Sequence, residues 1–119
     1  MADHNVLGRK GEELAVEYLV LKEFEILERN YRYQKAEIDI IARRGNTLIA
    51  AEVKTRSTPE FGDPQDFVKK KQIQQLVKAM NYYVEESGLD VEVRFDIIAI
   101  IKNKAGQKIE HIQDAFFYF

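Results

Sequence analysis

The sequence predicts an α/β fold in which helices flank a central mixed β-sheet to give three layers, in the order α-β-β-β-α-β. Two observations predict this fold. An amphipathic run near the N-terminus is followed by three strand-like runs with no helical pattern between them. A second amphipathic run separates the third strand-like run from the fourth, and a helix there provides the crossover that a parallel strand pair needs. We expect one domain that spans residues 1–119.

The first helix is predicted over about Val6 to Glu23, because apolar residues recur along one side at helical spacing. At about 100° per residue, the centre of this apolar stripe lies near Gly11 and Tyr18. Glu12 then borders the buried face, whereas Glu13 points mainly to water. Glu12 is either an acidic group that approaches the sheet or an ordinary acid of the first turn, which the helix dipole favours.

The remaining elements follow from strand-like runs and from residues that begin or end helices. A second helix is predicted to begin at Asp63-Pro64, which fits an N-cap followed by a first helical proline, and to end at Gly88. The segment from Arg56 to Phe61 has no periodicity and is expected to be a mobile loop. Strands are predicted over Phe24–Tyr33, Glu37–Arg43, Thr47–Thr55, Val91–Ile101 and Lys108–Ile112.

Composition excludes several kinds of site. The chain has no cysteine, so disulfides and thiolate metal sites are excluded, and a zinc cluster is not expected from two histidines, His4 and His111. No apolar run has the length of a membrane span or of a signal peptide, so we expect a cytoplasmic protein without a membrane partner. A net charge of −2 and a pI of about 5.7 argue against nucleic-acid binding over the whole surface, but they allow a local basic patch.

The most informative feature of the chain is a hairpin that brings acidic residues together. Gly45-Asn46 fits a two-residue hairpin loop, in which Arg44 pairs with Thr47. Counting outward from this pair places Asp39 directly opposite Glu52. Like charges that face each other on a sheet repel, so two facing carboxylates indicate a bound divalent cation.

The same counting places Glu37 opposite Lys54, on the face of the acidic pair, and the other face is expected to carry Ile38, Ile40 and Ala42. These residue types suit phosphodiester hydrolysis, in which carboxylates hold Mg²⁺ or Mn²⁺ and an ammonium positions the attacking water. Glu37 either tunes the Lys54 amine or forms a structural salt bridge with it. A solvated hairpin face with alternating charges is the alternative interpretation of the whole group.

Asp39, twelve intervening residues and then Glu52-Val53-Lys54 resemble the signature of PD-(D/E)xK nucleases, with Ile38 in the place of the proline. From near the N-terminus to about residue 100, the sequence is similar to the YraN family of bacterial endonuclease-like proteins, which is related to archaeal Holliday-junction resolvases. The family usually has glycine where this chain has Ala36. The matching stretches are Gly8–Ala15, Glu28–Arg32, Glu37–Asp39, Glu52–Arg56, Phe61-Gly62 with Pro64, Lys71 and Arg94–Asp96.

The resemblance implies a restriction-endonuclease-like three-layer fold and a nuclease that depends on Mg²⁺ or Mn²⁺ and acts on DNA, including branched or structured DNA. It implies that Asp39 and Glu52 hold the metal. Glu12 would add a direct or water-mediated ligand, the Val53 carbonyl would complete the set, and Lys54 would position the attacking water. The alternatives are a module on the same fold that binds nucleic acid or a protein without cleavage, and a structural protein that uses its aromatic end.

Two further features have more than one interpretation. The lysines near the beginning of the second helix either contact phosphates or form a solvated helix face. The aromatic segment 114–119 either caps the core or covers a homodimer partner or a nucleic-acid strand. Basic residues near the hairpin and the second helix are Arg29, Arg32, Lys35, Arg56, Lys69, Lys70, Lys71 and Lys78.

Overall fold

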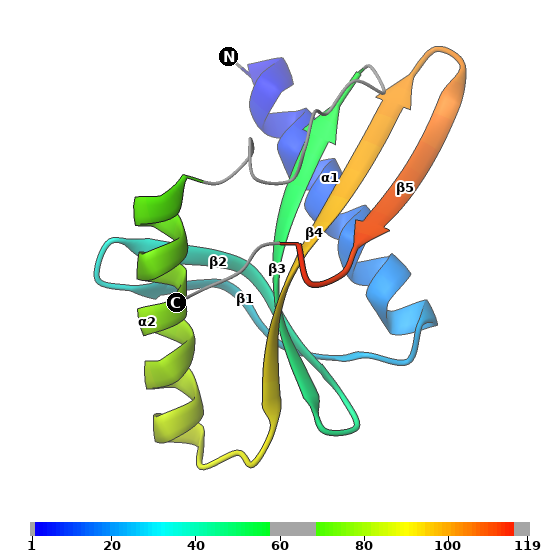
Figure 1. Cartoon of the computed structure of the whole chain (residues 1–119). Coiled ribbons are helices and arrows are strands. Elements are labelled where there is room, and N and C mark those ends of the chain that lie inside the picture. The colour runs from blue at the N-terminus through cyan, green and yellow to red at the C-terminus, as the bar shows by residue number, and fades with distance from the viewer. Residues whose placement is uncertain (1, 58–68, 116–119) are drawn as a thin grey trace.

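The computed structural model describes residues 2–57 and 69–115, and it describes residues 2–9 by their backbone alone. Its described elements form one five-stranded sheet in the order β1-β2-β3-β4-β5, in which β3 and β4 are parallel and the other neighbours are antiparallel (Figure 1). The predicted α/β fold with a mixed sheet is therefore confirmed. The elements are α1 (Ala2–Leu21), β1 (Glu25–Tyr33), β2 (Ala36–Arg44), β3 (Thr47–Arg56), α2 (Lys70–Ser87), β4 (Glu92–Asn103) and β5 (Gly106–Ile112).

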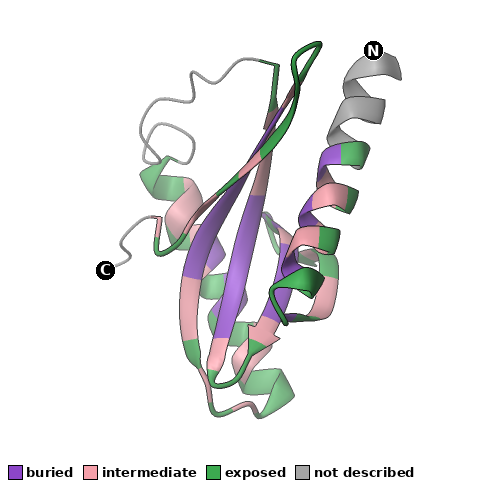
Figure 2. Ribbon diagram, turned by 90° about the vertical axis from the view of Figure 1, so that its right-hand side faces the viewer, coloured by how far each residue is buried: buried purple, intermediate pink, exposed green. Residues whose placement is uncertain are grey.

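Each helix covers one face of the sheet, which confirms the predicted three layers (Figure 1). Buried residues gather in the strands, while the outer sides of the helices are exposed (Figure 2). Within the described residues, neither helix has the length and apolar character that crossing a membrane requires. The cluster on the α1 side contains Ala15, Leu19, Ile40, Ala42, Ile49, Ala51, Ile98 and Ile100. The cluster on the α2 side contains Ile38, Ile41, Leu48, Leu76, Met80, Phe95 and Ile97.

The ends of the helices differ in part from the prediction. The predicted start of the second helix at Asp63-Pro64 lies outside the described residues, but Lys69 has extended angles (φ −76°, ψ 154°), so the described helix begins at Lys70. The predicted end is confirmed, because Gly88 has a φ of 67° and its N–H donates to Val84 O over 3.0 Å. The predictions for the loop over residues 56–61 and for the aromatic end fall largely outside the described residues.

The hairpin of β2 and β3 has the predicted register. Arg44 pairs with Thr47, and the ladder continues to the pair of Ile40 and Ala51. The ladder ends there, one step before Asp39, so the predicted direct pair of Asp39 with Glu52 is not part of it. The two-residue loop has therefore set the register, as expected from its length.

The strand pair of β1 and β2 bends away from β3 just beyond this ladder (Figure 1). Asn30 lies on β1 between the residues that pair with Ile40 and Ile38, and it has a φ of 53°, a left-handed conformation that turns the strand. Ile38 consequently packs on the α2 side, whereas Ile40 packs on the α1 side. The prediction that these two isoleucines share a face is wrong, because the bend rotates β2 between them.

Gly11 allows α1 to pack closely against β3. The residue is buried, and a Cβ at this position would overlap Thr55 Oγ1. Gly11→Ala should therefore lower the free energy of unfolding by about 1–3 kcal/mol, despite the higher helix propensity of alanine. Urea denaturation measures this change. A second substitution, Thr55→Ala, should restore part of the loss, and a Gly11→Ala variant as stable as the parent would contradict the close approach.

Candidate active site

Asp39 lies where β2 leaves β3, and its side chain bridges the two strands. The Val53 N–H donates a hydrogen bond of 2.8 Å to Asp39 Oδ2. The carboxylate thus acts as an acceptor in the place of a main-chain carbonyl, just past the last ladder pair. This bond holds the half-buried carboxylate against β3, beside the next acidic residue.

Glu52 is the buried acid of the pair. It alternates with Ala51 and Val53, which pack on the α1 side, so Glu52 belongs to the opposite side of β3. Its exposed fraction is 6%, and its Oε1 is buried without a hydrogen-bond partner among the described residues. An unpartnered carboxylate oxygen in a dry site is costly, so this atom requires a proton or a cation.

Both acids of the pair bind a proton more tightly than a free carboxylate does. Burial raises the pKa of Glu52 to about 8, and the neighbouring Asp39 carboxylate adds to the rise. Burial also raises the pKa of Asp39, although the bond from the Val53 N–H and the charge of Lys54 oppose this. Without a cation, the pair is therefore expected to hold a proton near neutral pH.

The raised pKa of Glu52 predicts how stability depends on pH in the absence of metal. The folded protein holds this proton more tightly than the unfolded chain, whose reference pKa is 4.5. The contribution of Glu52 to the free energy of unfolding is thus full below that value and is lost as the pH rises to about 8. Glu52→Gln should remove this slope from urea denaturation curves recorded in EDTA between those limits.

The control for this experiment is Glu17→Gln, which removes an exposed acid on α1. This variant should keep the slope of the parent. A Glu52→Gln variant whose stability falls with pH as steeply as that of the parent would remove Glu52 as the cause.

Lys54 and Glu37 both act on the acidic pair, but they do not form the predicted cross-strand pair. The positive charge of Lys54 lowers the pKa of both Asp39 and Glu52. Glu37 pairs instead with Arg32 on β1, and its Oε2 lies 3.5 Å from Arg32 Nη2. The predicted partnership with Lys54 is wrong, because β2 has already left β3 at this point.

Glu12 on α1 lies near enough to Asp39 to be affected by its charge. Burial is the main cause that raises the pKa of Glu12, and the charge of Asp39 raises it further. Glu13 is exposed and forms an ion pair of 2.7 Å with Arg29, so the predicted difference between the two acids is confirmed. Over residues 2–57 and 69–115, however, no three His, Asp or Glu side chains gather as a preformed metal cluster. Glu12 therefore stands apart from the Asp39 and Glu52 pair.

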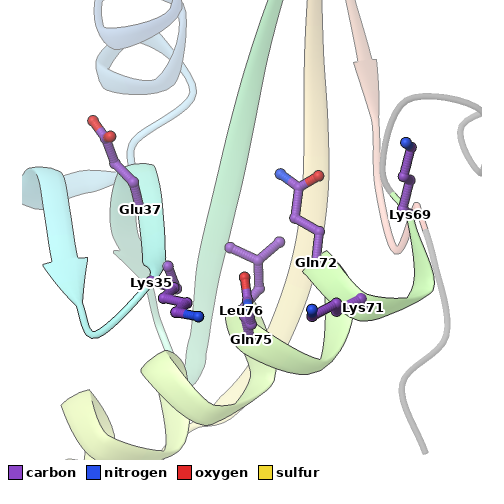
Figure 3. A pocket seen from close by; sticks show the side chains of 8 residues that line it. Lys35, Glu37, Lys69, Lys71, Gln72, Gln75 and Leu76 are labelled. Atoms are coloured by element: carbon purple, nitrogen blue, oxygen red, sulfur yellow. The ribbon is translucent and has the colours of Figure 1, made fainter.

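The basic residues divide between a cleft and the open surface. Lys69 and Lys71 line an open cleft of about 400 Å³ between α2 and the bent β1–β2 arm, which Figure 3 shows from close by. Lys70 is exposed and does not line this cleft. Arg56 Nη1 donates to Thr55 O over 2.9 Å at the end of β3. The full lining is Lys35, Ala36, Glu37, Lys69, Lys71, Gln72, Gln75 and Leu76.

A buried polar network on the neighbouring strands did not follow from the sequence. Asp96 is fully buried and accepts two bonds of 2.9 Å from Arg94 and one of 3.0 Å from the Asp114 N–H. His111 Nε2 lies 2.7 Å from Asp96 Oδ2, and its Nδ1 lies 3.1 Å from the Tyr18 hydroxyl. Burial opposes the ionisation of Asp96, but the bonds from His111 and Arg94 hold its pKa below the usual value. Asp96 is a lone acid within the apolar run of β4, and this pattern is the sequence feature that could have indicated a buried polar network. The network ties α1 to β4 and β5.

Similar proteins span nearly the whole chain. The UPF0102 protein of Christiangramia forsetii is 87% identical over 119 residues and covers 100% of both chains. The UPF0102 protein of Flavobacterium psychrophilum is 58% identical with the same coverage. That of Phocaeicola vulgatus is 43% identical over 98% of this chain and 97% of its own. The model of the uncharacterised protein family UPF0102 matches residues 11–100, so the chain belongs to the UPF0102 family.

Proposed function

We propose that this protein is a metal-dependent nuclease that hydrolyses phosphodiester bonds in DNA, with branched, structured or single-stranded DNA as its substrate. The observation that carries the proposal is the buried Oε1 of Glu52, which has no hydrogen-bond partner among the described residues. It lies beside Asp39 and Lys54, and hard divalent cations prefer carboxylate oxygens. The resemblance of these residues to the PD-(D/E)xK signature and of the chain to the YraN family supports the same chemistry. We expect the enzyme to act in the cytoplasm.

The side chains present fit a divalent cation. Asp39 and Glu52 would hold Mg²⁺ or Mn²⁺, Glu12 would contribute through a water, and the Val53 carbonyl would complete the set. When bound, the cation polarises the phosphate and lowers the pKa of a bound water. The bond from the Val53 N–H fixes the orientation of the Asp39 carboxylate. The ammonium of Lys54 would donate hydrogen bonds to the attacking water and stabilise charge that develops on the phosphate.

A cleavage assay tests this function. The parent protein is incubated with a labelled four-way junction, a single strand and a duplex of the same sequence, in Mg²⁺, in Mn²⁺ or in EDTA. We expect cleavage only with a cation, and none by a Glu52→Gln protein purified in parallel. Cleavage that persists in the Glu52→Gln preparation would reveal a contaminating nuclease, and a parent that cuts no substrate in either metal contradicts the proposal.

A second candidate function is a module that binds nucleic acid or a protein without cutting. The observation that favours it is that no three acidic or histidine side chains gather as a metal cluster in the part of the chain that the structure describes. DNA binding that weakens with salt, without turnover in either metal, would identify this function.

A further inference from the structure

The cleft beside α2 continues into a second one. A cavity of about 220 Å³ shares Lys35, Ala36 and Gln75 with the cleft of about 400 Å³. The second cavity adds Tyr33, Gln34 and Lys78 to the lining. Together the two form one groove between α2 and the β1–β2 arm, which we call the α2 groove. In Figure 3, Lys35 from the arm and Lys71 from α2 extend toward one another across it.

The α2 groove carries an excess of positive charge. Lys35, Lys69, Lys71 and Lys78 are all exposed, and none forms an ion pair with another described residue. Among the described lining residues, the one acid is Glu37, which already pairs with Arg32 on β1. Because the chain as a whole has a net charge of −2, this local excess points to a polyanionic ligand.

Residues in the groove and next to it suit unpaired bases. Lys71, Gln75, Lys78 and Tyr82 recur along one side of α2, over about 16 Å at 1.5 Å per residue. Tyr82 lines neither cavity, but it is 40% exposed and stacks on the lining residue Tyr33, with ring centroids 4.4 Å apart and an interplanar angle of 28°. Lysines beside an aromatic platform are typical of grooves for single strands, since bases inside a duplex are already stacked on one another.

The α2 groove also reaches the acidic pair. Glu37 lines the groove and lies two residues before Asp39 on β2, so one end of the groove lies beside the candidate active site. We propose that the α2 groove binds one unpaired DNA strand and leads it to Asp39 and Glu52. The inference rests on the proposed nuclease function, for which it names the form of the substrate.

Binding measured by fluorescence anisotropy in EDTA tests the groove without any cleavage. The probes are a labelled oligo(dT) of about 15 nucleotides and a duplex of the same length. Lys35→Ala with Lys78→Ala should weaken single-strand binding about tenfold or more, and should reduce the slope of log K against log salt by about 1.4. Lys104→Ala with Lys108→Ala removes the same charge from the β4–β5 hairpin and should leave both quantities unchanged.

Two further variants separate a binding role from a change in fold. Lys35→Arg with Lys78→Arg keeps the charge and should bind as the parent does. Tyr82→Ala should weaken the single strand about fivefold or more while leaving the duplex unchanged, because only unpaired bases stack on the ring. Equal losses in the groove and control pairs, or a Tyr82→Ala variant that binds the single strand normally, would overturn the inference.

The proposal for the groove and the proposal for the nuclease function can be contradicted independently. A parent that binds the single strand through these lysines but cuts nothing contradicts the nuclease function alone. If the parent cuts DNA, and the double variant Lys35→Ala with Lys78→Ala also binds and cuts normally, then only the proposal for the groove is contradicted.

Discussion

Lys54→Ala should slow cleavage by about a hundredfold or more while DNA binding stays within about twofold of the parent. The Lys54 ammonium lies close enough to the acidic pair to lower the pKa of both Asp39 and Glu52. It is therefore placed to act on the attacking water. For holding the phosphate backbone, it is one of several positive charges, so binding and turnover should separate. Single-turnover cleavage and anisotropy with the same labelled junction measure the two effects.

The pH profile distinguishes two ways in which Lys54 could act. If Lys54 served only to keep the two acids ionised, the rate of Lys54→Ala would recover as the pH rises and the acids lose their proton. If Lys54 instead positions the attacking water, the cleavage rate of Lys54→Ala should stay low at every pH. Lys108→Ala, on the distant edge strand β5, provides the matched control. Normal cleavage by Lys54→Ala would remove the proposed role, and a parallel loss of binding and cleavage would assign Lys54 to phosphate binding instead.

Asp39→Asn should abolish tight Mn²⁺ binding, with a loss of more than about a hundredfold, because a direct ligand contributes more than an outer-shell residue. The metal-free protein should stay folded and gain stability, since the repulsion between Asp39 and Glu52 disappears. The amide oxygen of asparagine can still accept the bond from the Val53 N–H. Titration calorimetry and thermal unfolding in EDTA measure the two quantities.

Asp90→Asn is the control for this substitution, because Asp90 is an exposed acid between α2 and β4. It should bind Mn²⁺ as the parent does. An Asp39→Asn protein with unchanged affinity would exclude Asp39 from the metal site. An Asp39→Asn protein that unfolds would show instead that the bond to Val53 is mainly structural.

Rules that relate residues close in the sequence were sufficient to predict the parts of the site that lie on regular helices and strands. The two-residue loop fixed the register from Arg44 to Ile40, because loop length sets the pairing of a tight hairpin. Helical periodicity separated Glu12, which is partly buried and near Asp39, from Glu13, which is exposed. Both results depend on neighbours that are close in the sequence.

The bend in β2 could not be predicted in the same way. Strand alternation assumes a regular strand, whereas Asn30, between the residues that pair with Ile40 and Ile38, adopts a left-handed conformation and turns both strands. This turn moves Ile38 to the other face and brings Glu37 next to Arg32. The α2 groove depends on the same bend, since the arm that forms one of its walls lies beyond it.

A Mn²⁺ titration of the isotope-labelled parent, followed by NMR, tests the metal site at Asp39 and Glu52 most directly. We expect saturable broadening that is strongest at the amides next to the acidic pair, with Val53 and Ile40 among the first to broaden, and no such broadening in the Glu52→Gln protein. Broadening confined to other acidic surfaces, or identical spectra for the parent and Glu52→Gln throughout the titration, would contradict a metal site at Asp39 and Glu52.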